Sequence, residues 1–132
     1  MTDPKSWPYE GIARIVAHRG GGKLAPENTL AALEEGARRG HRMVEFDAKL
    51  SADAVSFLLH DDGVERTSNG RGPAAAMRYQ ELAALDAGAW FDARFAGEQM
   101  PTLEAAAARC LALGLAANVE IKPCPGREVE TG

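Results

Sequence analysis

The chain has 132 residues and a formal net charge of −4, from 15 Lys and Arg against 19 Asp and Glu. This length fits one domain, and an apolar fraction of 45% can build a core, which excludes an intrinsically disordered chain. The mild acidity argues against a nucleic-acid binder or a polybasic membrane binder, and two cysteines are too few for a disulfide scaffold. No apolar run is long enough for a membrane anchor or a secretion signal, so we expect a cytoplasmic protein.

The start of the chain divides into a leader and a strand. Residues 1–11 carry two prolines and no apolar period, and we interpret them as a leader before a domain over 12–132. A short apolar run at 14–18 predicts a buried strand, which ends at the three glycines of 20–22.

A helix is expected next. Apolar residues recur at helical spacing over 30–37, after the residues PENT. Asn28 or Thr29 is a suitable N-cap, and Gly40 is a suitable residue to end the helix. The order so far is strand, loop, helix.

Two strands then follow with only four residues between them. Residues 43–50 alternate apolar and polar, and 55–60 form a second apolar run. A parallel crossover needs about a dozen residues, so the short link predicts an antiparallel hairpin. A turn centred just before Ala54 would place Asp47 opposite His60, although Ala54 is a weak turn residue where glycine is expected.

The second half of the chain predicts a long loop, two helices and a last strand. The loop covers 61–77, and a short helix follows at 78–87. Thr102 is an N-cap for a helix over 103–113, and 117–121 read as another buried strand. Strands that alternate with helices predict an α/β protein with a parallel sheet.

In such sheets the chemistry gathers at the carboxyl ends of the strands, where three carboxylates arrive here. Glu45 and Asp47 face one side of their strand, and Glu120 joins them if its strand is a neighbour. Crowded carboxylates repel one another unless a cation neutralises them, and oxygen ligands favour Mg²⁺ or Ca²⁺. The alternative is a set of solvated acids. The apolar neighbours of Glu120 favour the metal site, because an unpaired charge among them is costly.

Histidines and cations end the same strands. His18 and His60 each follow an apolar run and precede a charged residue, which fits a general acid/base pair better than two structural histidines. His41 lacks this context. Arg19 and Lys122 are either plain surface cations or, beside a metal cluster, binders of an anion such as phosphate. Together these residues indicate metal-assisted phosphoryl chemistry.

Seven motifs resemble, in order and spacing, those of the glycerophosphodiester phosphodiesterase family. They are HRG at 18–20, PENT at 26–29, EFD at 45–47, HD at 60–61, LDAG at 85–88, FAGEQMPTLEA at 95–105 and NVEIKP at 118–123. The resemblance covers nearly the whole chain. It implies a TIM barrel that hydrolyses deacylated phospholipids, such as glycerophosphocholine, to glycerol 3-phosphate and an alcohol in lipid and glycerol metabolism.

The resemblance also implies a role for each candidate residue. The catalytic pair is His18 and His60. The ligands of a divalent cation, Mg²⁺ or Ca²⁺, are Glu45, Asp47 and Glu120. The substrate phosphate is bound by Arg19 and Lys122. These roles agree with the chemistry of the residues themselves.

The length departs from the family pattern, because a TIM barrel needs about 250 residues and eight strands. We therefore expect a barrel truncated to about its first half. The strands at 14–18 and 117–121 would each keep an open edge, which favours self-association. Two alternatives stay open: an inactive fragment that at most binds metal or phosphate, and a related phospholipase-type phosphodiesterase.

Overall fold

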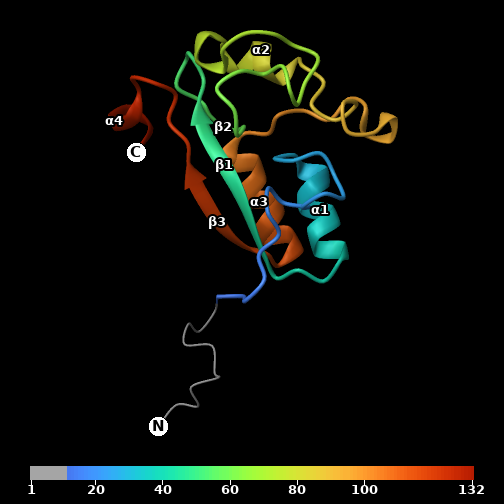
Figure 1. The fold of residues 1–132 in the computed structure, drawn as a ribbon. Helices are drawn as coiled ribbons and strands as arrows, with labels where there is room; N and C mark the ends of the chain where they lie inside the picture. The colour runs from blue at the N-terminus through green and yellow to red at the C-terminus, as the bar shows by residue number, and fades with distance from the viewer. Residues whose placement is uncertain (1–11) are drawn as a thin grey trace.

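The computed structural model describes residues 12–132, so the expected leader at 1–11 lies outside the described residues. Four α-helices and three strands occur in this range (Figure 1). In chain order they are α1 Leu30–Arg38, β1 Met43–Leu50, β2 Ser56–Leu58, α2 Tyr79–Ala83, α3 Leu103–Leu113, β3 Ala116–Ile121 and α4 Glu128–Thr131. The longest of these helices, α3, has 11 residues, and none could cross a membrane.

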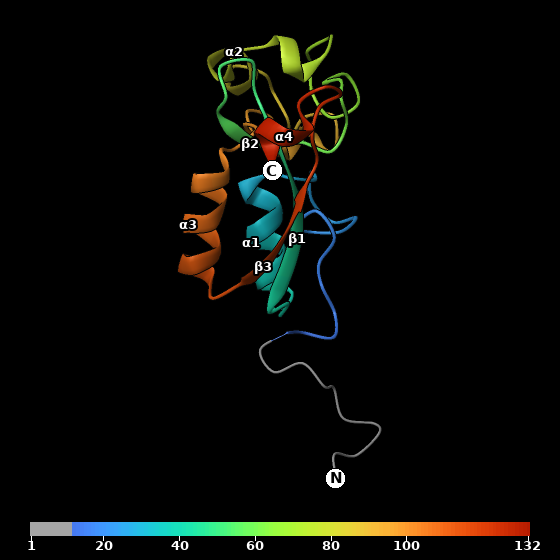
Figure 2. The same cartoon turned by 90° about the vertical axis from the view of Figure 1, so that its left-hand side faces the viewer.

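The sheet has the order β2-β1-β3. β3 runs parallel to β1, with Asp47 paired to Glu120. β2 runs antiparallel to β1 and pairs with its carboxyl-terminal end. Helices α1 and α3 pack on one face of this sheet, as the two views in Figures 1 and 2 show. The core between them contains Val44 and Phe46 of β1, both fully buried. The opposite face of β1 is thereby left to its polar residues.

Both main helices are capped by residues that the sequence offers, and of the two candidates for α1 the structure selects Thr29. The Thr29 hydroxyl accepts the backbone N–H of Ala32 at the start of α1, and the Thr102 hydroxyl accepts that of Ala105 at the start of α3. Gly114 ends α3 at a left-handed φ of 68°, a conformation that glycine adopts without steric cost.

Helix α2 is shorter than the expected 78–87 and ends at Ala83. Asp86 explains the early end, because its carboxylate accepts the backbone N–H groups of Gly88, Ala89 and Gly97. These bonds fix a loop conformation that competes with continuation of the helix.

The hairpin is confirmed, but its predicted register is wrong by one residue. Leu58 lies opposite Ala48, and the backbone carbonyl of Asp47 accepts a hydrogen bond from the backbone N–H of Leu59, so Asp47 does not face His60. The turn has three residues, the last of which is Ala54 at a left-handed φ of 61°. A three-residue turn with a left-handed last residue shifts the centre of pairing relative to an even turn.

The expected strand at 14–18 is reduced to a single parallel bridge between Ala17 and Val44, and Ile15 is 70% exposed. β3 forms as predicted but is exposed along its whole length, not buried. The reason is that β1 is the only strand paired with β3 within residues 12–132. The sheet is therefore unclosed, and the long segment after β2 adds no barrel strand to it.

Candidate active site

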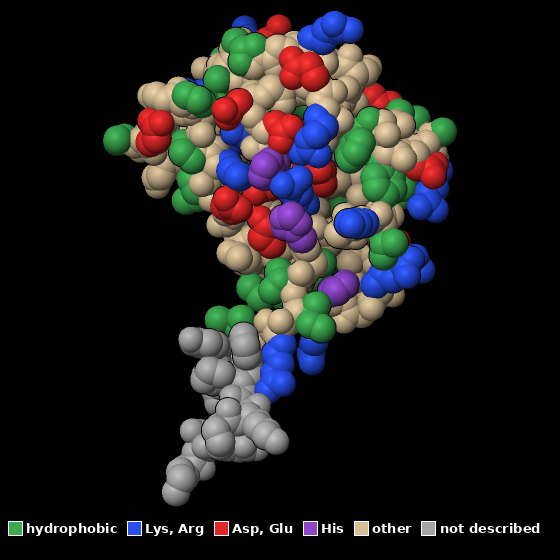
Figure 3. Space-filling view, in the orientation of Figure 1, with side chains coloured by type: hydrophobic (Ala, Val, Ile, Leu, Met, Phe, Trp, Pro, Cys, Tyr) green, Lys and Arg blue, Asp and Glu red, His purple; other side chains and the backbone are tan. Residues whose placement is uncertain are grey.

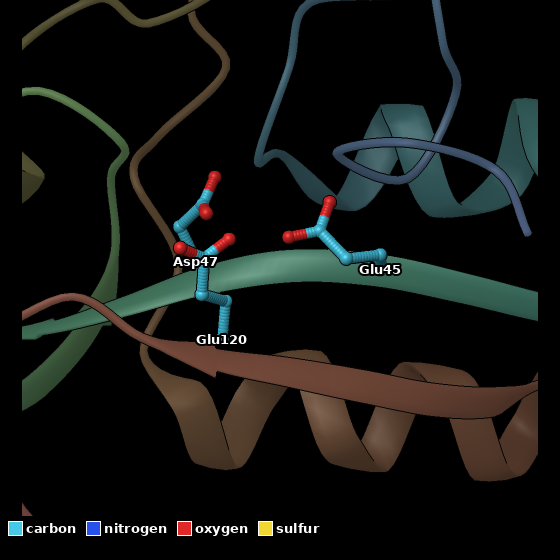
Figure 4. A group of neighbouring side chains, drawn as sticks. All are labelled: Glu45, Asp47 and Glu120. Carbon is cyan, nitrogen blue, oxygen red and sulfur yellow. The ribbon is translucent and has the colours of Figure 1, made fainter.

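Three carboxylates meet on the polar face of the sheet. Glu45, Asp47 and Glu120 each offer an oxygen within 4.8 Å of the others (Figure 4). The period of two along β1 puts Glu45 and Asp47 on one face, and the parallel pairing of β1 with β3 brings Glu120 beside Asp47. The sequence prediction that these three residues converge is confirmed.

The first two carboxylates are only partly hydrogen-bonded. Oε1 of Glu45 and Oδ1 of Asp47 are buried without a hydrogen bond. Burial raises the pKa of Glu45, and the nearby charges of Asp47 and Glu120 add to this rise. An all-oxygen donor set with orphaned buried atoms suits a hard divalent cation, so the residues present fit such an ion.

Glu120 differs from its sequence-based description. Its side chain is 53% exposed, and its apolar neighbours on β3 are exposed as well. The cost of burying an unpaired charge therefore does not apply to Glu120. The place of Glu120 in the cluster follows instead from the register of β3 against β1. Lys122 Nζ lies 3.4 Å from Glu120 Oε1, so the predicted phosphate-binding lysine stands beside the third carboxylate.

Arg19 lies at the centre of the contacts around this cluster. Its backbone N–H donates to Glu45 Oε2 at 3.0 Å, from a left-handed φ of 54° that non-glycine residues rarely adopt. Its guanidinium donates to Glu27 at 2.9 Å and places Nε 3.7 Å from Asp47. Asn28 also holds Asp47, through hydrogen bonds in both directions. The cluster is thus fixed from the loop before α1.

The two predicted histidines occupy different surroundings. His18 is 70% exposed, with Nε2 3.8 Å from Glu45 Oε2. His60 Nδ1 lies 2.8 Å from Asp61 Oδ1. Arg66 hydrogen-bonds the Asp61 carboxylate, which lowers its pKa well below the ordinary range and keeps it ionised. Figure 3 shows histidine, acidic and basic side chains gathered on one face of the molecule.

Sequence reasoning missed several residues of this face. Glu27 and Asn28 were read only as part of a motif and a possible helix cap, and Arg66 was placed in a loop. Lys49 was also missed: its side chain is 1% exposed, and Nζ donates to Asp62 at 3.1 Å. The period of two that places Asp47 beside Glu45 also places Lys49 on this face.

The comparisons with known proteins bear on this geometry. Residues 18–131 match the glycerophosphoryl diester phosphodiesterase family. The chain belongs to this family. It is 42% identical over 89 residues to a glycerophosphodiester phosphodiesterase of Caldanaerobacter subterraneus subsp. tengcongensis, with 67% of this chain covered. It is 38% identical over 117 residues to glycerophosphodiester phosphodiesterase 1 of Homo sapiens, with 87% covered.

A solved structure shows the same family fold. The phosphodiesterase of Oleispira antarctica, in complex with its product sn-glycerol 3-phosphate, superposes with a TM-score of 0.86 at 41% identity. The match covers 88% of this chain and 47% of that one, while the chain spans 37% and 35% of the two sequence relatives. The fold is thus a part of the TIM barrel of glycerophosphodiester phosphodiesterases, with an unclosed sheet.

Proposed function

We propose that this site hydrolyses glycerophosphodiesters, such as glycerophosphocholine, to glycerol 3-phosphate and an alcohol. The observation that carries the proposal is the trio of carboxylates, two of which have a buried, unpartnered oxygen, with His18 Nε2 3.8 Å from Glu45 Oε2. Membership of the family supports the substrate class. The Oleispira relative is in complex with its product sn-glycerol 3-phosphate, which supports a reaction in which the phosphate stays on the glycerol and the alcohol is released.

In this proposal Glu45, Asp47 and Glu120 hold one divalent cation, Mg²⁺ or Ca²⁺. Such a cation, when bound, neutralises charge on the phosphate oxygens. Arg19 and Lys122 bind the same phosphate as cations from the protein.

The two histidines share the proton transfers. One of His18 and His60 takes a proton from the nucleophile, either water or the neighbouring glycerol hydroxyl, and the other protonates the departing alkoxide. Asp61 supports the assignment of His60, because an ionised carboxylate stabilises an imidazolium as it forms.

A second candidate is binding of metal and phosphate without turnover. Glu120 is half exposed, and β3 lacks a neighbour on its outer edge within the described range. A site with that open side positions the glycerol group poorly, and poor positioning slows the reaction. We therefore expect turnover well below about 1 s⁻¹, at the low end for enzymes.

The proposal also includes the domain bounds and the cellular compartment. We place 12–132 in one catalytic domain, with 1–11 as a leader, and the protein in the cytoplasm. Cys110 and Cys124 are both unpaired thiols, which supports a reducing compartment. The proposed substrates, deacylated phospholipids, are products of lipid breakdown.

The test is release of glycerol 3-phosphate and choline from glycerophosphocholine by the full chain, with phosphatidylinositol as the comparison substrate. We expect slow release that requires Mg²⁺ or Ca²⁺ and stops in excess EDTA. His18→Ala and His60→Ala should each reduce it roughly 10²–10⁴-fold. His41→Ala is the matched control and should keep the wild-type rate.

Four other outcomes would contradict the proposal. Release that persists in EDTA excludes a role for the metal. Release that persists in both histidine variants excludes the acid/base pair. Product binding with no release supports the binding-only candidate. Faster cleavage of phosphatidylinositol than of glycerophosphocholine favours a phospholipase-type enzyme.

A further inference from the structure

One arginine outside the predicted site contacts two carboxylates at once. Arg66 binds Asp61 through Nε at 2.8 Å and Nη2 at 2.9 Å. It binds Glu27 through Nη1 at 2.8 Å and Nη2 at 3.0 Å. Both contacts are bidentate, the geometry in which a guanidinium binds carboxylates most strongly.

The first of these contacts reaches His60. Asp61 receives hydrogen bonds from Arg66, stays ionised and can only accept hydrogen bonds, so the proton between it and His60 belongs to the imidazole Nδ1. A neutral His60 in this arrangement carries its lone pair on Nε2. Arg66 bonds both oxygens of Asp61 and so fixes the orientation in which Oδ1 faces His60 Nδ1. In this way the position of the His60 proton depends on the contact between Arg66 and Asp61.

The second contact joins two segments that are far apart in the sequence. Glu27 also accepts a hydrogen bond from Arg19, next to His18 in the chain. Arg66 and Glu27 are 39 residues apart, so this ion pair ties the loop after His60 to the loop that carries the other predicted catalytic histidine.

Exposure alone would suggest a weak contact, since the Arg66 side chain is 46% exposed and isolated surface ion pairs contribute little. Two features distinguish it from such pairs. Its partners are less exposed than Arg66 itself, with Glu27 at 12% and Asp61 at 32% exposure, and one guanidinium hydrogen-bonds both. A network with bidentate geometry is the case in which exposed charges do fix side-chain orientation.

We propose that Arg66 is a positioning residue, which acts through Asp61 to keep the proton of neutral His60 on Nδ1 and, through Glu27, to fix the two histidine-bearing loops relative to each other. The proposal rests on the proposed function for its consequence in catalysis. Arg66 itself touches neither of the predicted catalytic histidines in the described contacts.

The experiment is magic-angle-spinning NMR of the full chain labelled with ¹⁵N-histidine, which reads the imidazole nitrogens whatever the size of the assembly. His60→Ala identifies the His60 signals. In the wild type at a pH where His60 is neutral, we expect the proton on Nδ1. Arg66→Ala should convert His60 to the mixture of both tautomers that histidine shows in water, and the His41 signals should not change.

Matched variants separate this effect from unfolding. Arg71→Ala removes an exposed arginine of the same loop and should leave the tautomer as in the wild type. Arg66→Lys keeps the charge but cannot form two bidentate contacts, so it should restore the Nδ1 proton only in part. If Arg66→Ala disorders the loop, the tautomer of His60 in Arg66→Lys and in Asp61→Asn is compared with the wild type instead.

An unchanged tautomer in Arg66→Ala, or a wild type with the proton on Nε2, would overturn the proposal. Turnover gives a separate arm, in which Arg66→Ala should lose roughly 10-fold or more, as outer partners of catalytic groups do. A chain that never hydrolyses glycerophosphocholine refutes the proposed function, and the NMR result still decides the role of Arg66.

Discussion

Asn28 and Asp47 hold each other by two hydrogen bonds in opposite directions. Asn28 Nδ2 donates to Asp47 Oδ2 at 3.0 Å, and Asn28 Oδ1 accepts the backbone N–H of Asp47 at 3.1 Å. Asn28 does this at a left-handed φ of 58°, which asparagine tolerates better than most residues. The loop before α1 and the centre of β1 are therefore fixed together at the predicted metal ligand.

Two substitutions of Asn28 should separate the effect of an added charge from the effect of losing the hydrogen bonds. Asn28→Asp sets a second carboxylate against a buried one and should reduce the free energy of unfolding by roughly 2–3 kcal/mol. Asn28→Gly keeps the backbone conformation but loses both hydrogen bonds, and should cost about 1–2 kcal/mol. Urea unfolding in EDTA measures both values. Equal stability of Asn28→Asp and the wild type at pH 7 would refute the pairing.

Glu45 should destabilise the chain when no cation is present. Its pKa is raised, so the folded state binds the proton more tightly than the unfolded state, and stability falls as pH rises through the raised pKa. This loss is absent well below the ordinary value of 4.5 and complete above the raised one. Glu45→Gln should therefore raise Tm at pH 7 in EDTA and leave it nearly unchanged at low pH.

The order of stability should reverse with metal. At a cation concentration about 100 times Kd, binding stabilises the wild type by about 2.7 kcal/mol, and Glu45→Gln loses much of this. Thermal unfolding in EDTA and in Mg²⁺ or Ca²⁺ shows the crossing. Glu98→Gln, away from the cluster, is the control and should respond to metal like the wild type. A Glu45→Gln chain that is less stable than the wild type in EDTA would contradict the prediction.

The hairpin turn should be improved by glycine. Ala54 occupies a left-handed conformation that costs a residue with a β-carbon about 1–2 kcal/mol. Ala54→Gly removes this cost, and the greater freedom of glycine in the unfolded chain returns part of it, so we expect a net gain of about 0.5–1 kcal/mol. Ala52→Gly, in the same turn without a positive φ, should be neutral or destabilising. Equal effects of the two changes in urea unfolding would exclude strain at Ala54.

The particular residues show what a sequence of this kind can predict. The alternation along β1 and the caps Thr29 and Thr102 depend on neighbouring residues only, so the carboxylate face and both main helices were correctly predicted. The hairpin register depended on a left-handed conformation of Ala54, and an alanine in the sequence does not predict that conformation.

Other features depend on the assembled fold. The burial of β3 is decided by what covers its outer side, and the run of apolar residues alone does not report that. The contact of Arg66 with Glu27 joins residues 39 positions apart across two irregular loops. No local pattern marks it, so the link between the two histidine loops was found only in the structure.

The open edge of β3 should drive self-association. Val119 and Ile121 are 39% and 54% exposed on a strand whose outer backbone groups have no partner strand within residues 12–132. Size-exclusion chromatography with light scattering should show species larger than a monomer. Ile121→Lys should reduce them, because lysine on an edge strand opposes pairing. Leu111→Lys removes an apolar residue of 83% exposure on α3 and should have no such effect. A monodisperse wild-type monomer would contradict this prediction.

Titration calorimetry of Mg²⁺ and of Ca²⁺ into the full chain tests most directly whether β1 and β3 build a metal site. The account predicts one cation per chain, with affinity reduced at least about 10-fold by Glu45→Gln and by Glu120→Gln and unchanged by Glu98→Gln. Binding of both cations that is equally strong in all four proteins, or no binding to the wild type, would contradict it.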